Sequence, residues 1–320
     1  GTSIGMVLPA MLFIAYKTGT LDFTSQGIVA GTIDPQTIVV LLLLLIFGFA
    51  KAAIMPFHAW LPAAMVAPTP VSALLHAVAV VKVGVFCVAR VITSVFGTNL
   101  LASLELDTIV CIIAAFTILF SSLIALSQDD LKRRLAFSTI GQLSYIVLGV
   151  ALLSKSGMAG GLLHIAMHAF GKITLFFCAG AIFVTTGVKN ISQMVGIGRQ
   201  MPLTMSAFFI GAVSVIGLPP CGGFISKWHL VIGTVEAGQF TMLVVLLVSS
   251  LLNAAYFLPI VYRAFFCKPE DGMFRTPMDE ETRWFLLTLL LTAVLFVVLF
   301  FYPQPFLQLA QNAVVVILGG

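Results

Sequence analysis

Four lysines and three histidines lie inside long apolar runs of this sequence, where titratable side chains are rare. They are Lys51, Lys82, Lys172, Lys227, His76, His164 and His168. A lysine at the centre of a bilayer costs roughly 2.5–3.5 kcal/mol on insertion scales, so each position needs a physical reason. Proton transfer suits these residue types, because histidine titrates near neutral pH and burial brings lysine closer to that range.

The clearest pattern is His164, His168 and Lys172, which follow one another at intervals of four residues. Each interval turns a helix by about 40° and raises it by about 6 Å, so the three side chains form one polar stripe. Such a stripe, bridged by water, can pass protons. The two histidines could instead pack in the core or bind a metal ion, but no third carboxylate or cysteine ligand accompanies them.

A buried lysine can also extend its ammonium group to the membrane surface. Lys51 lies about six residues from the end of its run, so this alternative applies to it. It also applies to Lys227, which follows a segment of uncertain depth in the membrane. Lys82 and Lys172 lie about twelve or more residues from either end, beyond the reach of the side chain. His76 and Lys82 are about 120° apart on a helix, so they share no stripe but could line a path between several helices.

The composition excludes a water-soluble globular domain. Of the 320 residues, 60% are hydrophobic and 9% are charged, and the mean hydropathy is +1.13. Soluble domains are about 25% charged. We therefore predict an all-α, polytopic transmembrane helix bundle, because a membrane-spanning segment must satisfy its own backbone hydrogen bonds.

Nine apolar runs predict membrane-spanning segments, and residues 304–320 predict a short amphipathic or partial tenth helix. The nine runs are 1–17, 36–57, 70–95, 106–127, 134–153, 158–186, 202–235, 240–266 and 284–303. The sixth and seventh are too long for one straight helix, and we expect breaks at Gly171 and at Gly217–Gly223. Broken helices in a membrane line cavities and indicate transport sites.

The basic residues outside the spans predict the orientation. Alternating spans place nine of them on one face and three, Lys17, Arg90 and Lys155, on the other. The nine are Lys132, Arg133, Arg134, Lys189, Arg199, Arg263, Lys268, Arg275 and Arg283. Because cytoplasmic loops are enriched in lysine and arginine, the first face is predicted to be cytoplasmic.

Other residue types limit what the chain can do alone. The five cysteines are scattered without a CxxC pair, so we expect no disulfide framework, iron–sulfur centre, other cofactor or metal site. We expect no nucleic-acid partner either. All acidic residues fall in loops or at helix ends, so the lysines lack a carboxylate partner inside the spans. The sequence opens apolar and without methionine, so we expect that helices upstream of Gly1 are missing and that the acidic partner lies there or on a neighbouring subunit.

Four segments carry a family resemblance: AKAAIMPFHAWLPAAMVAPTPVSALLHAVAVVKVGVFCVAR (50–90), DLKRRLAFSTIGQLSYI (130–146), HIAMHAFGKITLFFCAG (164–180) and GLPPCGGFISKW (217–228). They resemble the antiporter-like membrane subunits shared by respiratory complex I (NADH-quinone oxidoreductase), Mrp-type cation/proton antiporters and membrane-bound hydrogenases. The resemblance implies inverted five-helix repeats, each with a broken helix. Residues 1–105 would be a truncated first repeat, 106–266 a complete second repeat, and 267–320 a C-terminal helix and tail.

The resemblance also assigns roles to the buried residues. It implies that Lys51 and Lys227, on the broken helices, are the central proton-transfer residues, and that Lys82 and Lys172 connect them. His76, His164 and His168 would belong to the same polar axis. The family's glutamate partner for Lys51 lies on a helix that this chain lacks. Some members carry glutamate in place of Lys227, which disfavours the middle subunit of complex I.

We therefore expect a proton-translocating, or Na⁺/H⁺-translocating, subunit of a multisubunit complex in a bacterial or archaeal inner membrane. Its partners would be other membrane subunits, the transported ions and the lipid bilayer. The chain would contain no redox centre. An Mrp-type antiporter subunit, a stand-alone solute transporter and a non-transporting scaffold subunit remain alternatives.

Overall fold

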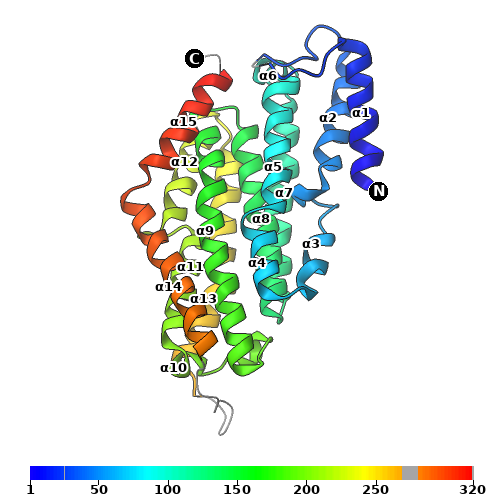
Figure 1. The fold of residues 1–320 in the computed structure, drawn as a ribbon. Helices are drawn as coiled ribbons and strands as arrows, with labels where there is room; N and C mark the ends of the chain where they lie inside the picture. Colours follow the sequence, from blue (N-terminus) through cyan, green and yellow to red (C-terminus); the bar gives the residue numbers. More distant parts are fainter. Residues whose placement is uncertain (25, 269–279, 319–320) are drawn as a thin grey trace.

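A computed structural model describes residues 1–24, 26–268 and 280–318, with side chains left out for 280–285. The helices are α1 (Thr2–Thr18), α2 (Pro35–Gly48), η1 (Ala50–Ala52), α3 (Trp60–Ala63), η2 (Ala64–Val66), α4 (Thr69–Ala77), α5 (Val80–Arg90), η3 (Val91–Phe96), α6 (Thr98–Ser103), α7 (Leu106–Ser127), α8 (Leu131–Ala151), α9 (Lys155–Thr186), η4 (Ile191–Gln193), α10 (Ile197–Gln200), α11 (Pro202–Ile216), α12 (Gly222–Glu236), α13 (Phe240–Phe266), α14 (Glu280–Phe301) and α15 (Gln304–Leu318). Figure 1 shows them as a helix bundle. The predicted all-α fold is confirmed for these residues, in which the one extended pairing is an isolated bridge between Asp130 and Asn190.

Five helical segments are long and apolar enough to cross a membrane: Thr69–Phe96, α7, α8, α9 and α13. The pair formed by α14 and α15 is a sixth candidate, bent by 62° at Tyr302–Pro303. Each of the nine predicted runs contains a helix, but α1, α2 and α11 are shorter than a full span. The chain is a multi-pass membrane protein, as predicted.

The positions of the breaks agree only in part with the prediction. The seventh run is broken as expected, because α11 ends at Ile216 and α12 begins at Gly222. The second run is also broken, after α2. The predicted break at Gly171 is wrong, and α9 continues through it for 32 residues. One glycine costs a helix only about 1 kcal/mol, which neighbouring helices can offset.

The third run contains a break that the sequence did not predict. Helix α4 ends at Ala77 and α5 begins at Val80, with no proline or glycine between them. The N–H of Ala79 donates to the carbonyl of Leu74 at 3.1 Å, a five-residue spacing typical of a π-bulge. The break lies about one turn before Lys82.

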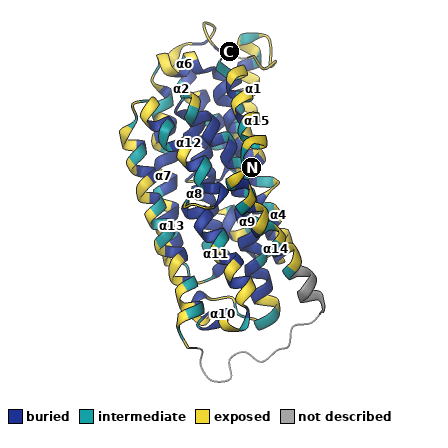
Figure 2. Cartoon of the chain, turned by 90° about the vertical axis from the view of Figure 1, so that its left-hand side faces the viewer, coloured by how far each residue is buried: buried dark blue, intermediate teal, exposed yellow. Residues whose placement is uncertain are grey.

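Helix α9 lies at the centre of the bundle and packs against α4, α8, α11, α12, α14 and α15. In Figure 2 the buried residues gather along these inner helices, whereas exposed residues follow the outer surfaces. The contact between α9 and α12 is made by glycines, since a Cβ placed on Gly233 would lie 2.2 Å from the Cα of Gly157. Small residues of this kind let two membrane helices approach closely.

Three of the loops predicted to share the basic face, 58–69, 128–133 and 187–201, do lie together, toward the lower end of Figure 1. The N–H of Leu131 donates to the carbonyl of Lys189 at 3.1 Å, and the N–H of Gly196 donates to the carbonyl of Arg263 at 3.0 Å. At the opposite end, Glu236 accepts a hydrogen bond from the N–H of Ser156 at 3.0 Å. Arg275 and the side chain of Arg283, predicted for the basic face, lie outside the described part. That the basic face is cytoplasmic stays a prediction.

The glycine contact predicts a strong effect of one methyl group. Gly233→Ala must push α12 away from the backbone of α9, and overpacking of this kind costs about 1–3 kcal/mol. We expect a lower thermal unfolding midpoint for the purified protein in detergent. Gly5→Ala is the matched control, because no atom lies within 4 Å of the added carbon. Equal midpoints for the two variants would contradict this packing.

Candidate proton-transfer site

A row of polar side chains crosses the centre of the bundle from α5 through α9 to α12. Lys82 Nζ lies 2.7 Å from His168 Nδ1. The ring of His168 lies 5.8 Å, centroid to centroid, from that of His164, one helical turn away on α9. Lys227 closes the row on α12, with the ring of Tyr145 between it and His164. All four side chains are buried.

His164 is held by one partner at each ring nitrogen. Its Nδ1 lies 2.8 Å from Ser226 Oγ, and its Nε2 lies 3.0 Å from Gln142 Oε1. Ser226 also donates to the carbonyl of Gly223 at 3.1 Å, at the start of α12. Both partners are buried, so together they fix the orientation of the ring.

Lys227 lies against the break between α11 and α12. Its Nζ donates to the carbonyl of Ile216, the last residue of α11, at 3.0 Å, and to Ser250 Oγ on α13 at 3.3 Å. It also lies 4.6 Å from the centre of the Tyr145 ring, which in turn lies 5.7 Å from the ring of His164. Tyr145 thus stands between His164 and Lys227.

Lys172 belongs to the predicted stripe on α9 but points toward α8. It is fully buried, and its Nζ donates to the carbonyl of Leu135 at 3.1 Å and lies 5.7 Å from the ring of Phe257. Lys172 lies one helical turn after His168 on α9. It therefore extends the row toward α8 without a direct hydrogen bond to His168.

His76 lies beside the row. Its ring is fully buried and packs 5.1 Å from the ring of Phe176 on α9. Neither of its ring nitrogens has a hydrogen-bond partner within the described residues. It is therefore not linked to the row by a direct hydrogen bond within the described residues.

The structure does not bring Lys51 into the row. Its side chain is exposed, as the alternative of an ammonium group reaching the surface allowed. The break around it is nevertheless tightly packed, because a Cβ placed on Gly84 would lie 2.2 Å from the backbone nitrogen of Ala52. Trp60 Nε1 donates to the carbonyl of Ala50 at 2.8 Å and satisfies one of the acceptors that the break leaves open.

Sequence reasoning missed Gln142, Tyr145 and Ser226. They are uncharged, and polar residues on membrane helices do not stand out by composition. The signal that could have found them is their place inside the resembling segments, since Ser226 directly precedes Lys227 and the other two lie in FSTIGQLSY.

The contacts of the ring nitrogens of His164 and His168 disfavour a metal site at these two histidines. Both nitrogens of His164 face Gln142 and Ser226, and Nδ1 of His168 faces Lys82. A lysine beside a would-be metal ligand adds a positive charge where a cation would have to bind. The geometry suits transfer of protons between neighbouring groups better.

Comparison with known proteins identifies the family. The family described as NADH:quinone oxidoreductase/Mrp antiporter, TM, matches residues 2–253. NADH-quinone oxidoreductase subunit N of Desulforudis audaxviator is 41% identical over 256 residues, which are 79% of this chain and 51% of that protein. Na⁺/H⁺ antiporter subunit A1 of Staphylococcus haemolyticus is 31% identical over 293 residues, which are 84% of this chain and 36% of that protein. The chain thus spans about half or less of the length of these relatives.

A solved structure has the same fold. A chain of the membrane-bound sulfane sulfur reductase, an archaeal respiratory membrane complex, superposes with a TM-score of 0.86 at 30% identity. The match covers 98% of this chain and 63% of that one. These relatives are subunits of multisubunit membrane complexes. The resemblance of the four sequence segments to antiporter-like membrane subunits is therefore confirmed. This chain therefore belongs to the NADH:quinone oxidoreductase/Mrp antiporter family of transmembrane subunits.

Proposed function

We propose that this chain translocates protons as a membrane subunit of a multisubunit complex, and that the row from Lys82 to Lys227 is its proton path. The observation that carries the proposal is the direct contact between Lys82 and His168 across two helices. A protonated lysine has only donors, so it must donate to Nδ1, whereas a neutral lysine amine can accept from an Nδ1–H group. The two arrangements differ by the position of one proton.

The remaining contacts extend this step along the row. A water molecule or a rotation of the ring can carry the proton from His168 to His164, one turn away on α9. His164 then faces Ser226, whose hydroxyl can both donate and accept, and Lys227, beyond Tyr145, is the next basic group, on α12. Lys172 would tune the row through its charge or accept a proton from it.

The same proposal extends to features that depend on the whole protein. Lys51 would act at the outer end of the row with an acidic partner from another segment or subunit. Residues 1–105 and 106–266 would be the two inverted repeats, followed by a C-terminal helix and tail at 267–320. The complex would lie in a bacterial or archaeal inner membrane, with its basic face toward the cytoplasm.

Exchange of Na⁺ against protons is the second candidate. It is favoured by the similarity to an Na⁺/H⁺ antiporter subunit over 84% of this chain. The same row would then carry the proton half of the exchange. Sodium-dependent proton movement in vesicles that contain the complex would distinguish this candidate from proton transport driven by a redox reaction.

Removal of a row lysine should leave the complex assembled but slow its proton transport. We expect Lys227→Ala and Lys172→Ala to lower the rate by about 10²-fold, as for the loss of an acid–base group. His164→Ala should be milder, because water can replace one member of the row. Lys155→Ala, at an exposed position on the opposite face from the basic loops, is the control. Unchanged proton uptake into proteoliposomes by both lysine variants would overturn the proposal.

The contact between Lys82 and His168 can be tested without transport. The chain has five histidines, so ¹⁵N spectra of histidine-labelled protein can be assigned residue by residue. We expect Lys82→Met to change the Nδ1 signal of His168, because that nitrogen loses its partner. His58, which contacts Pro56 and Phe137 instead, is the internal reference. An unaltered His168 signal would show that the pair does not form.

A further inference from the structure

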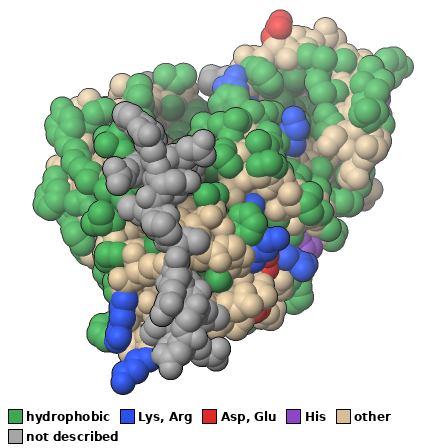
Figure 3. All heavy atoms as spheres, turned by 60° about the horizontal axis from the view of Figure 1, so that its bottom comes forward, with side chains coloured by type: hydrophobic (Ala, Val, Ile, Leu, Met, Phe, Trp, Pro, Cys, Tyr) green, Lys and Arg blue, Asp and Glu red, His purple; other side chains and the backbone are tan. Residues whose placement is uncertain are grey.

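A hollow of about 1080 Å³ opens on the basic face, between the segment that links α3 to α4, the start of α8 and the end of α9. Its walls are largely apolar and include Met65, Phe137 and Phe183. Figure 3 shows this end of the molecule, where lysine or arginine side chains gather beside an acidic and a histidine side chain. The hollow is separate from the buried row and plays no part in the proposed proton path.

The charged groups that line the hollow are mainly basic. They are Lys132, Arg133, Lys189 and Asp130, a formal charge of +2 from three basic groups and one acidic group. The carboxylate of Asp130 is already engaged, because it accepts from the N–H of Arg133 at 2.8 Å and caps α8. Asp129, next to it, accepts from the N–H and the hydroxyl of Ser192 at 2.9 and 2.7 Å. The acidic groups here are therefore used by helix and loop structure.

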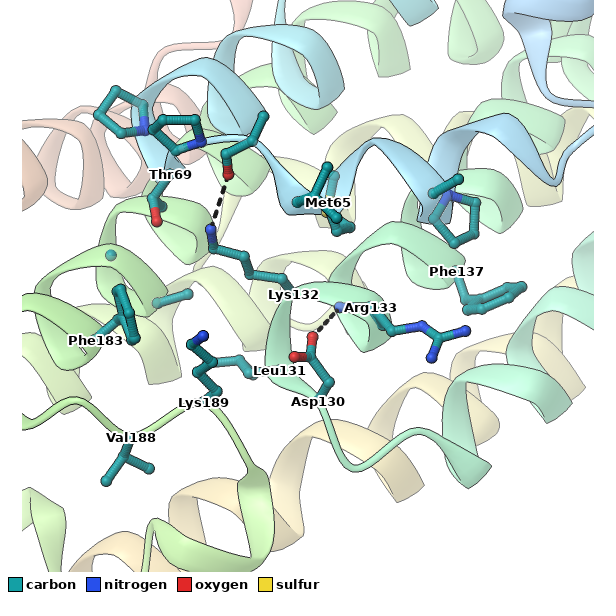
Figure 4. A pocket seen from close by; sticks show the side chains of 18 of the residues that line it. Met65, Thr69, Asp130, Leu131, Lys132, Arg133, Phe137, Phe183, Val188 and Lys189 are labelled. Carbon is teal, nitrogen blue, oxygen red and sulfur yellow. Dashed lines mark hydrogen bonds between the residues drawn. The ribbon is translucent and has the colours of Figure 1, made fainter.

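Two lysines lie on the same side of the hollow. Lys132 Nζ donates to the carbonyl of Ala67 at 3.2 Å, and Lys189 Nζ lies 4.9 Å from the ring of Phe183. Figure 4 shows their side chains one below the other, whereas Arg133 extends away from them. Lys132 is attracted by the carboxylate of Asp130 and repelled by the ammonium group of Lys189. An anion bound between the two lysines would relieve the repulsion.

The apolar part of the lining indicates what kind of anion fits. Val66 is 95% exposed and Val184 is 72% exposed, and Val184 lies near the end of the membrane-length helix α9. A small soluble anion makes no use of such residues, whereas acyl chains would cover them. The core of a protein–protein interface is usually depleted of lysine, so the pair of lysines disfavours a partner subunit as the occupant.

We infer that this hollow binds an anionic glycerophospholipid, with the phosphate between Lys132 and Lys189 and the acyl chains along Val66 and Val184. Basic pockets between membrane helices at the cytoplasmic side suit anionic head groups in charge and in position. The bound lipid would fill the space between the α3–α4 segment and α9, and so would join the part of the chain that carries Lys82 to the part that carries Lys172 and Lys227.

Native mass spectrometry of the purified complex tests this inference directly. The probes are phosphatidylglycerol and cardiolipin, each compared with zwitterionic phosphatidylcholine. We expect the wild type to retain the anionic lipids preferentially and Lys132→Gln/Lys189→Gln to lose this preference by roughly 30-fold, from about 1 kcal/mol for each basic residue. Lys189→Gln alone should lose roughly fivefold on the same scale. Lys189 is exposed, so the single variant should fold.

Two control variants separate charge from structure. Lys132→Arg/Lys189→Arg keeps both charges and should keep the preference, and Lys155→Gln removes an exposed charge near the opposite end of α9 and should also keep it. Equal retention of anionic and zwitterionic lipid by the wild type, or unchanged preference in both glutamine variants, would overturn the inference. So would displacement of the lipid by inorganic phosphate alone, or capture of a partner subunit by a photo-crosslinker at Val66.

Discussion

A lysine buried among apolar helices must be surrounded by hydrogen-bond acceptors, and this requirement shapes the centre of the molecule. Each buried lysine in the described part of the chain finds its acceptor on another helix. Lys82 on α5 meets His168 on α9, Lys172 on α9 meets the carbonyl of Leu135 on α8, and Lys227 on α12 meets the end of α11 and Ser250 on α13. The three lysines therefore connect the helices that the proposed proton path would cross.

The helix breaks supply what these lysines need. An intact helix uses its carbonyl groups internally, whereas the end of α11 leaves the carbonyl of Ile216 free to accept from Lys227. Asn253 Nδ2 donates to the neighbouring carbonyl of Val215 at 3.4 Å, so a second open acceptor of the same helix end is also satisfied. The bulge between α4 and α5 lies just before Lys82. In this fold the breaks and the buried charges depend on each other.

Much of this arrangement could be predicted from the sequence, for definite physical reasons. The stripe of His164, His168 and Lys172 follows from helical spacing alone, and the break at Gly217–Gly223 follows from two prolines and three glycines. The bulge before Lys82 could not be predicted, because it contains neither residue type and depends on packing against neighbouring helices. The pairing of Lys82 with His168 is a tertiary fact, since it joins residues that are 86 positions apart in the chain. The continuous path of α9 through Gly171 shows the same limit, because the surrounding helices outweigh a weak local preference.

The central claim is that Lys82, His168, His164 and Lys227 form one path in series. The most direct test measures proton transport by the complex with Lys82→Met, with Ser226→Ala, and with both changes together. If the steps occur in series, the double variant should transport protons at the rate of the slower single variant. The slowest step then sets the overall rate, and the less impaired step has no further effect. A double variant whose loss equals the product of the two single losses would mean that the sites act independently, and would contradict the account.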